Sequence, residues 1–289
     1  MAGSSPLVRH RETIALWALA VVFATACVLL GRWQLDRYED KSARKQLVTR
    51  NYDTAPVPLA QVLASPDAAF DPADQWRQVR VSGTYDAAGT TLVRNRPRRG
   101  SGATAEFGYE VVVPLRLADG SALLVDRGWL PSGSGSGDPG QAPDAVPPPP
   151  GGRVEVVARL RPSEPARSGR LPQGQALSVT VPGIGARLGY PVHGAYGVLV
   201  QETPATQPAP APLDPPVLDG GEGINASYAV QWGLFALLGL AFPVWVRRRR
   251  RTLAAEQQAV LQHVEDPGRL RDLEPAPPRR RRIWDADDE

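Results

Sequence analysis

The chain has 289 residues, of which 42% are hydrophobic and 22% are charged, and its formal net charge is +3. This composition allows one sizeable folded domain with additional segments, and the small net charge argues against nucleic acid as a partner. A single cysteine, Cys27, excludes an internal disulfide framework, a CxxC redox centre and a thiolate metal cluster, and with them copper delivery through paired cysteines.

Two apolar segments, residues 13–30 and 229–246, dominate the layout of the chain. Each is about as long as the hydrocarbon core of a bilayer requires, so both are predicted to be transmembrane helices. Pro243 is compatible with the second helix because neighbouring groups in a membrane protein can satisfy the carbonyl that it frees. We expect the first segment to be an uncleaved anchor, since its apolar run continues past Cys27.

Basic residues on the flanks of these segments predict their orientation. Arg9 and Arg11 precede the first segment, and five consecutive arginines, residues 247–251, follow the second. The positive-inside rule then places both termini in the cytoplasm and the region between the helices outside it. The stretch before Thr13 is short for a transit peptide, which favours a bacterial plasma membrane over a mitochondrial inner membrane and makes membrane lipids expected partners.

Between the apolar segments the pattern is that of short strands, rich in Val, Leu and aromatic residues and bounded by Gly, Asp or Pro. Strands are predicted at residues 77–86, 90–97, 107–117, 121–130, 153–161, 176–180 and 195–202. The dipeptide Asp119-Gly120 predicts a tight hairpin, because both residues tolerate positive φ. One short helix is expected at residues 184–189. The predicted fold is an α+β membrane protein, in which two transmembrane helices flank an extracytoplasmic antiparallel β domain.

Two tracts rich in proline and glycine complete the predicted division of the chain. The predicted parts are a cytoplasmic N-terminus (1–12), a transmembrane helix (13–30), the β domain (31–202) with an insertion (131–152), a linker (203–228), a second transmembrane helix (229–246) and a basic, disordered cytoplasmic tail (247–289). Neither tract can bury enough apolar surface to order itself. A modest helix is expected early in the tail, after Arg251.

The sequence holds no convincing catalytic motif. Gly135, Gly137 and Gly140 have GxGxxG spacing, but no strand precedes them and no helix follows them. Of the three histidines, only His193 falls outside the predicted cytoplasmic parts, so a multi-histidine metal site is not expected there. A serine triad would need His193 together with an aspartate that the sequence does not locate. We therefore expect the chain not to be an enzyme.

Five motifs follow one another beside and between the apolar segments: GRWQLDRYEDK, RVSGTYD, LVRNRP with FGYEVVVPLR, LLVDRGWLP, and SYAVQW. This ordered set resembles the Surfeit locus protein 1 family of cytochrome c oxidase assembly factors, over residues 31–129 and 196–242. The resemblance implies a membrane-bound chaperone that supports haem a centre formation in oxidase subunit I, its expected partner, by holding haem or by stabilising the subunit. The competing interpretation is a binding or scaffolding module of the cell envelope, unrelated to respiration.

The candidate site lies where the chain leaves the first apolar segment and enters the second. Its residues, at helical spacing, are Trp33, Gln34 and Arg37 on one side and Tyr228, Gln231 and Trp232 on the other. We expect the two motifs to lie at the same membrane depth and to face each other. They are either interfacial anchors, as aromatic belts and snorkelling basic side chains are, or contacts to a partner or to haem propionates.

Basic residues of the β domain are further candidates. Arg127 either points to solvent or is held by a carboxylate such as Asp126 or Glu110, and the resemblance favours a structured role. Four arginines cluster in and after one predicted strand: Arg94, Arg96, Arg98 and Arg99. Guanidinium groups match the propionates of haem, although a cluster in a loop is more often simply exposed.

One departure from the family pattern concerns haem. Family members commonly carry a histidine three residues before the tyrosine that corresponds to Tyr228, and Asn225 stands at that place here. Asparagine is a poor axial ligand for haem iron, which leaves His193 as the one extracytoplasmic imidazole. The sequence therefore predicts either that haem a is held weakly or transiently, or that the chain acts on the oxidase subunit itself.

Overall fold

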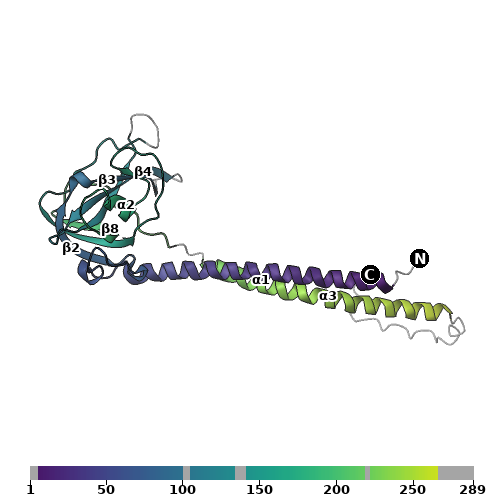
Figure 1. Ribbon diagram of the computed structural model, residues 1–289. Coiled ribbons are helices and arrows are strands. Elements are labelled where there is room, and N and C mark those ends of the chain that lie inside the picture. The colour runs from purple at the N-terminus through teal and green to yellow at the C-terminus, as the bar shows by residue number, and fades with distance from the viewer. Residues whose placement is uncertain (1–5, 100–104, 134–140, 219–221, 266–289) are drawn as a thin grey trace, which may run out of the picture. The chain divides into compact units, whose positions relative to one another are not determined.

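The computed structural model describes residues 6–99, 105–133, 141–218 and 222–265 (Figure 1). The chain divides into two compact units, which we call the helical unit (residues 1–38 and 223–289) and the β domain (residues 39–222). The GxGxxG match and the tail beyond residue 265 lie outside the described residues.

Two long helices begin and end outside the apolar segments. Helix α1 spans Pro6–Asn51 and helix α3 spans Glu222–Glu265. At about 1.5 Å per residue each is much longer than a hydrocarbon core of about 30 Å, so each continues into polar sequence. The last residues of the predicted linker, including Asn225 and Tyr228, therefore lie within α3, and the modest helix expected after Arg251 is the end of the same helix.

The helices of the helical unit pack through a narrow stripe of mostly small side chains, which we call the seam. Its residues recur at intervals of three and four: Leu16, Ala20, Ala24, Cys27, Gly31, Gln34 and Tyr38 on α1, and Asn225, Ala229, Trp232, Ala236, Gly239, Pro243 and Val246 on α3. Ala24, Cys27 and Ala236 form a buried cluster at its centre. This spacing is that of left-handed helix pairs, and small residues allow the backbones of membrane helices to approach closely.

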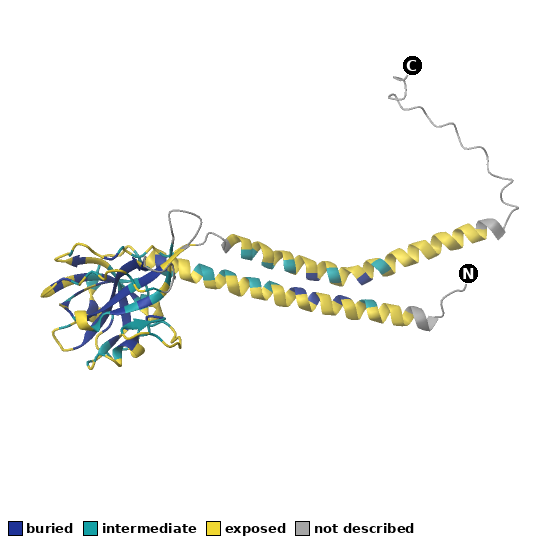
Figure 2. Cartoon of the chain, turned by 90° about the horizontal axis from the view of Figure 1, so that it is seen from above, coloured by how far each residue is buried: buried dark blue, intermediate teal, exposed yellow. Residues whose placement is uncertain are grey.

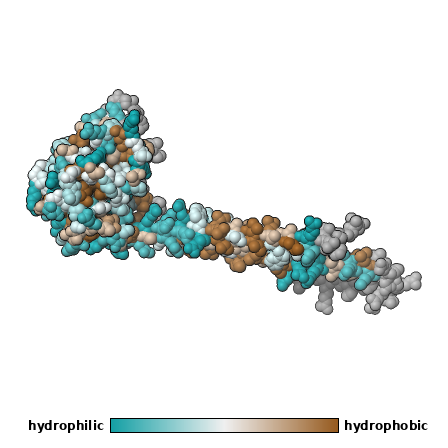
Figure 3. All heavy atoms as spheres, viewed as in Figure 1, coloured by the Kyte–Doolittle hydropathy of each residue, from teal (hydrophilic) through white to brown (hydrophobic). Residues whose placement is uncertain are grey.

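The large apolar side chains of the same helices point away from the seam. Leu19 and Val22 are each 66% exposed, and Leu237 is likewise 66% exposed. Figure 2 shows that most of α1 and α3 is exposed, and Figure 3 shows a brown apolar band on the helices between more polar stretches. Both helices are long and apolar enough to cross a membrane, which indicates membrane association.

The β domain is built on one mixed sheet of eight strands. They are β1 (Val57–Pro58), β2 (Gln78–Tyr85), β3 (Thr91–Arg99), β4 (Ala105–Arg116), β5 (Ala122–Pro131), β6 (Arg153–Pro162), β7 (Gln175–Ala176) and β8 (Val192–Thr203). Their order is β1-β2-β6-β8-β5-β4-β3-β7, and a further pairing of β2 with β4 joins β2, β6, β8, β5 and β4 into a ring. The sheet thus closes into a five-stranded barrel, to which β3 is added on β4.

The prediction of an antiparallel domain was wrong for three of the strand pairs. The pairs β1–β2, β3–β7 and β5–β8 are parallel, whereas the remaining pairs are antiparallel. Strand β8 follows β5 only after β6, β7 and a helix, so the chain crosses over and returns in the same direction as β5. The α+β class itself is confirmed.

Short elements fit the local sequence. In the β4–β5 hairpin Gly120 has φ of +84° and Asp119 Oδ1 accepts a hydrogen bond from Ser121 N at 2.9 Å, which confirms the predicted turn. Helix α2 spans Val181–Gly185, earlier than the predicted residues 184–189, because Pro182 is well suited to a first helical turn. Within the described ranges, single 3₁₀ turns lie at Leu59–Gln61, Pro72–Asp74 and Ala87–Gly89.

The core of the β domain lies on both faces of β5. Leu123 and Val125 belong to a large cluster together with β2, β4 and β6, and this cluster fills the barrel. Leu124 belongs to a second cluster, which includes Ile184 of α2 and lies outside the barrel. A strand that is covered on both faces reads as a continuous apolar run, which is why the sequence LLV in this strand does not alternate.

The C-terminal end of α1 belongs to the β domain and is tied to it by polar contacts. Asn51 is buried, and its Nδ2 donates hydrogen bonds to Ala73 O at 2.7 Å and Gln75 O at 2.9 Å. Thr54 Oγ1 donates to the Asn51 carbonyl, which is one of the carbonyls that a helix end leaves without an intrahelical partner. The last turns of α1 are therefore part of the folded domain.

Candidate functional site

The aromatic and polar residues predicted to flank the apolar segments lie at one level of the helical unit. A Cβ atom placed on Gly31 would lie 3.4 Å from Trp232 Cβ, and Phe23 lies beside Gly239 further along the pair. Because the helices run antiparallel, the same register brings Gln34 to the level of Tyr228. The structure thus brings the GRWQLDRYEDK and SYAVQW motifs together.

These residues divide into two groups by exposure. Gln34, Asn225 and Trp232 lie half-buried in the seam, where they shape the helix pair. Trp33 is 54% exposed and Tyr228 is 47% exposed, while Gln231 is also exposed.

A basic side chain accompanies the exposed group. The Arg37 guanidinium lies 5.8 Å from the centre of the Trp33 ring, within range of a cation–π contact. We call Trp33, Arg37 and Tyr228 the aromatic face. An exposed aromatic ring with a cation stacked on it can contact lipid headgroups or a partner protein.

Arg127 does not belong to such an exposed surface. Its side chain is fully buried, and it makes two hydrogen bonds to Glu202, from Nε at 3.2 Å and from a terminal nitrogen at 2.6 Å. It also donates to Thr206 Oγ1 and lies over the Tyr85 ring, 5.4 Å from its centre. The structured role expected for Arg127 is therefore confirmed, but its carboxylate is Glu202 and not Asp126 or Glu110.

The two residues after Arg127 hold a segment that sequence predicted to be unordered. Gly128 has φ of +133° and approaches the Ala211 carbonyl so closely that a Cβ atom would overlap with it. The Trp129 backbone exchanges two hydrogen bonds with Ala211, at 2.7 and 2.9 Å, and its indole donates to Arg96 O at 2.9 Å. The prediction of a wholly unordered linker was wrong at Ala211, because Trp129 lies beyond the part of β5 that pairs with β8, and its backbone forms a bridge with Ala211 instead.

A cluster of carboxyl groups lies on the outer face of the barrel, which we call the carboxyl cluster: Glu110, Asp126 and Glu164. Arg96 pairs with two of its members, at 2.8 Å from Glu110 and 2.6 Å from Glu164. The Tyr196 hydroxyl donates to Glu164 at 3.4 Å. Arg96 is thus engaged inside the domain and is not available to propionates, while Arg98 lies over the Trp129 ring and 3.8 Å from Asp214.

The members of the carboxyl cluster titrate in opposite directions. Burial and the nearby Glu110 raise the pKa of Asp126 well above its ordinary value, and burial also raises the pKa of Glu110 despite the charge of Arg96. For Glu164 burial acts in the same direction, but the hydrogen bond and charge of Arg96 outweigh it and lower the pKa. Two adjacent carboxylates cannot both ionise at low cost, so the proximity of Glu110 favours the protonated form of Asp126.

His193 lies at the start of β8, beside the β4–β5 hairpin. It is buried, and its Nε2 lies 3.3 Å from Ser121 Oγ, which in turn donates to Asp119 at 2.6 Å. Burial lowers the pKa of the imidazole. The carboxylate holds the serine and not the histidine, which is not the order of a serine triad, where the carboxylate orients the imidazole.

Several of these residues could not be found from the sequence. Glu202 and Glu164 lie 75 and 68 positions from their arginine partners, so no local spacing marks the pairs. The pKa of Tyr85 is raised by burial and by Glu202. In the sequence Tyr85 is only a tyrosine at the end of a strand, which does not mark it as a partner of these residues. A charged residue inside an apolar strand is the signal that the sequence does provide, and it marks Arg127.

The described part of the chain therefore defines a class of protein: a small closed barrel joined to two membrane-length helices. In the barrel Arg96 and Arg127 are paired with carboxylates, and the exposed aromatic residues of the candidate site lie on the helices. Among the described residues no group of three or more His, Cys, Asp or Glu side chains could hold a metal ion.

Comparison with known proteins identifies the family. The family model described as the SURF1 family matches residues 21–237. An uncharacterized SURF1-like protein of Mycobacterium bovis is 32% identical over 252 residues, which cover 83% of this chain and 87% of that protein. A SURF1-like protein of Mycobacterium tuberculosis matches with the same identity and coverage. A SURF1-like protein of Dictyostelium discoideum is 28% identical over 116 residues, or 39% of this chain and 42% of that protein.

The chain belongs to the SURF1 family, which confirms the resemblance drawn from its five motifs. Members of this family are known generally as cytochrome oxidase assembly factors, and they are associated with membranes. The matched region includes most of the apolar part of α1, the whole barrel and the first part of α3, so family membership rests on both units of the structure.

Proposed function

We propose that this protein is a non-enzymatic, membrane-bound assembly factor of cytochrome c oxidase, which supports formation of the haem a centre in subunit I. The observation that carries the proposal is a family match that extends from α1 through the barrel into α3. One further observation supports it: the His193 and Ser121 side chains are buried against each other. The aromatic face remains exposed for a partner.

The experiment that tests this proposal compares oxidase in membranes with and without the protein. We expect membranes that lack it to show a reduced haem a absorbance band, while b-type haems are retained, and plasmid-borne protein to restore the band. Unchanged oxidase spectra and activity in the deletion strain would contradict an assembly role. That result would favour a cell-envelope scaffold unrelated to respiration.

The proposed topology places both termini in the cytoplasm of a bacterial cell and the β domain outside it. Its support is the run of arginines at residues 247–251, which directly follows the second apolar segment. A reporter that is active only in the cytoplasm, fused after Glu289, should be active. If the topology were reversed, that reporter would be inactive, and a reporter that is active only outside the cytoplasm would be active at the same position.

We further propose that the protein holds haem a weakly or transiently. The residues present do not fit an axial ligand: Asn225 is an amide in the seam, and the His193 imidazole is buried against Ser121. The purified protein should therefore show at most a substoichiometric Soret band, and Asn225→His should strengthen it. A stoichiometric haem spectrum that persists in His193→Ala would show that a tyrosine or a partner chain supplies the ligand.

A further inference from the structure

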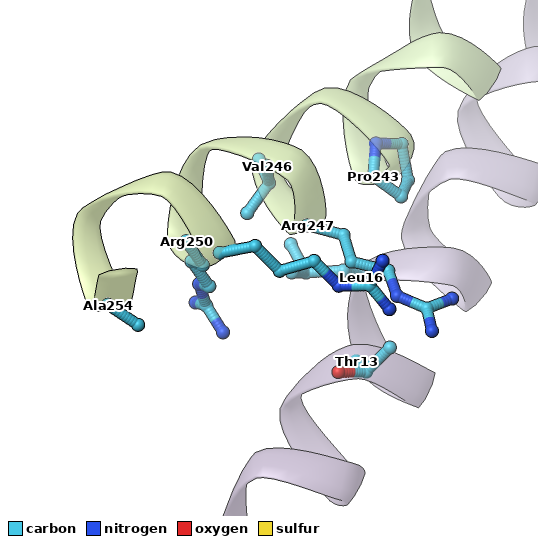
Figure 4. A pocket seen from close by; sticks show the side chains of 8 residues that line it. Thr13, Leu16, Pro243, Val246, Arg247, Arg250 and Ala254 are labelled. Carbon is cyan, nitrogen blue, oxygen red and sulfur yellow. The ribbon is translucent and has the colours of Figure 1, made fainter. Parts of the chain in front are cut away.

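A cavity of about 270 Å³ opens between α1 and α3 at the basic end of the helical unit (Figure 4). Its apolar wall is formed by Leu16 of α1 and by Pro243 and Val246 of α3. Its polar rim is formed by Arg247, Arg250 and Arg251. The cavity therefore joins an apolar surface to a concentration of positive charge.

The spacing of the arginines selects which of them reach the cavity. Residues 247, 250 and 251 stand at positions i, i+3 and i+4, which lie on one side of a helix. The two remaining arginines of the run do not line the cavity, and one of them, Arg249, lies over the Trp245 ring at 5.5 Å from its centre. A uniform basic run is thus divided by helical geometry into a cavity side and an outer side.

The charge on the cavity side is only partly compensated by the described residues. Arg250 lies 3.3 Å from Glu12 of α1, in a pair whose side chains are both about half exposed. Glu12 is the one described carboxylate that an ion pair ties to this rim, so three guanidinium groups are matched by one acid. Guanidinium groups bind phosphate in a bidentate way, and a rim with excess positive charge favours an anion.

The apolar wall restricts the kind of anion. Leu16, Pro243 and Val246 belong to the seam at the end of the apolar segments, where a hydrocarbon chain could lie along the helices. Basic pockets between membrane helices are known as sites for the headgroups of anionic lipids. A phosphate that carries acyl chains satisfies both the rim and the wall, whereas a free phosphate satisfies only the rim.

We infer that Arg247, Arg250 and Arg251, above the apolar wall of the seam, form a binding site for the phosphate headgroup of an anionic phospholipid. The inference rests on the membrane insertion included in the proposed function. Bound in this way, the lipid reduces the excess positive charge of the rim and fills the gap between the helices with its acyl chain. The end of the helix pair is then held together by a lipid as well as by side chains.

The test uses the full-length chain reconstituted in vesicles that contain equal amounts of phosphatidylglycerol and phosphatidylcholine. After extraction, native mass spectrometry counts the lipids retained per chain. We expect the wild type to retain phosphatidylglycerol over phosphatidylcholine by on the order of tenfold. The double variant Arg247→Gln/Arg251→Gln should lose this preference.

The matched control is Arg248→Gln/Arg249→Gln, which removes the same charge from the same run but leaves the cavity rim intact. It should retain the preference of the wild type. Equal loss in both double variants would overturn the site, since it would show diffuse attraction to the whole run. A second variant, Val246→Trp, keeps every charge and fills the cavity, and unchanged lipid retention in this variant would also overturn the site.

Two further measurements distinguish a lipid headgroup from a soluble phosphate, and loss of the lipid site from loss of the membrane anchor. Inorganic phosphate at millimolar concentration should not displace phosphatidylglycerol, and complete displacement would assign the rim to a soluble phosphate and overturn the lipid site. Flotation of the vesicles shows whether the chain is inserted. A chain that does not float contradicts the membrane anchor itself, whereas a floating chain without lipid preference contradicts only the inference.

Discussion

The β domain and the helical unit differ in the size and polarity of the side chains that they bury. In the β domain, ionisable groups such as Arg127 and Asp126 are enclosed and apolar residues fill the barrel. In the helical unit half of the seam residues are Ala, Gly or Cys, and large apolar side chains such as Leu19 and Leu237 point outward. The first arrangement is stable in water, and the second is stable where the solvent is hydrocarbon.

Buried side chains therefore stabilise the two units in different ways. In water the burial of apolar surface stabilises the fold, and a buried charge is costly unless it is paired, as Arg127 is with Glu202. Between membrane helices there is little hydrophobic driving force, so close packing of small residues replaces it. Substitutions that remove a partner or add a charge should therefore have effects that depend on the unit.

The largest expected effect is in the β domain, at the ion pair between Arg127 and Glu202. Arg127→Ala should lower the free energy of unfolding by about 3–5 kcal/mol, because it leaves the Glu202 carboxylate buried without its partner. Thermal unfolding of the full chain in detergent measures this. Replacing both residues by leucine should recover part of the loss, since both charges are then removed.

The control for this prediction is Arg80→Ala, which removes a cross-strand ion pair with Glu155 whose side chains are 53% and 56% exposed. Exposed pairs contribute about 0–1 kcal/mol. Equal destabilisation by Arg127→Ala and Arg80→Ala would mean that the enclosure of the Arg127 pair does not matter.

A somewhat smaller effect is expected from a charge on the outward face of the helical unit. Val22 is 66% exposed, so Val22→Asp would be nearly neutral for a helix in water. In a bilayer a charge near the middle of a helix costs about 2.5–3.5 kcal/mol of insertion free energy. We therefore expect a smaller fraction of Val22→Asp chains in the carbonate-washed membrane fraction.

Val260→Asp is the matched control, because Val260 is 63% exposed on α3 but lies beyond the apolar segment. It should leave the membrane fraction unchanged. If the two variants partition alike, the outward apolar face of α1 is not in contact with lipid.

The smallest effect concerns the raised pKa of Asp126 in the carboxyl cluster. At pH values between the ordinary pKa of an aspartate and the raised one, the folded protein binds more protons than the unfolded chain. This contribution lowers stability as pH rises from the ordinary range of an aspartate towards the raised value. Asp126→Asn keeps the shape of the side chain without this titration.

The expected difference is on the order of 1 kcal/mol between pH 5 and pH 8, with the advantage of Asp126→Asn over the wild type greater at pH 8. Melting temperatures at the two pH values measure it. Glu155→Gln, at an exposed carboxylate, should show no such pH-dependent gain. An advantage that is greatest at pH 5 would have the opposite sign and would contradict a raised pKa of Asp126.

Local patterns in the sequence were sufficient to predict most helices and strands but not which strands pair with one another. The apolar segments of α1 and α3, most strands and the Asp119-Gly120 turn depend on neighbouring residues, and the sequence predicted them. The parallel pair β5–β8 depends on a crossover between strands that are far apart, so local pattern gave no sign of it. The length of α1 was also missed, since its polar half is stabilised by the β domain through Asn51.

The candidate site, too, could be predicted from the sequence only in its local features. Helical spacing correctly grouped Trp33 with Arg37, because both lie on one continuous helix. It could not reveal that Gln34 and Asn225 lie half-buried in the seam, since that depends on the register of the two helices. Nor could it identify Glu202 as the partner of Arg127, because strand pairing brings together residues that are distant in the chain.

The most direct test of the account is the amount of assembled oxidase supported by a chain whose aromatic face is altered. Trp33→Leu should stay in the membrane at the wild-type level and lower the haem a band per copy of the protein, because an exposed aromatic anchor of a partner contact is lost. Arg32→Gln, one residue away at the exposed pair with Asp36, should support wild-type oxidase. A normal haem a band with Trp33→Leu stably present in the membrane would contradict the account and would leave Trp33 as an interfacial anchor.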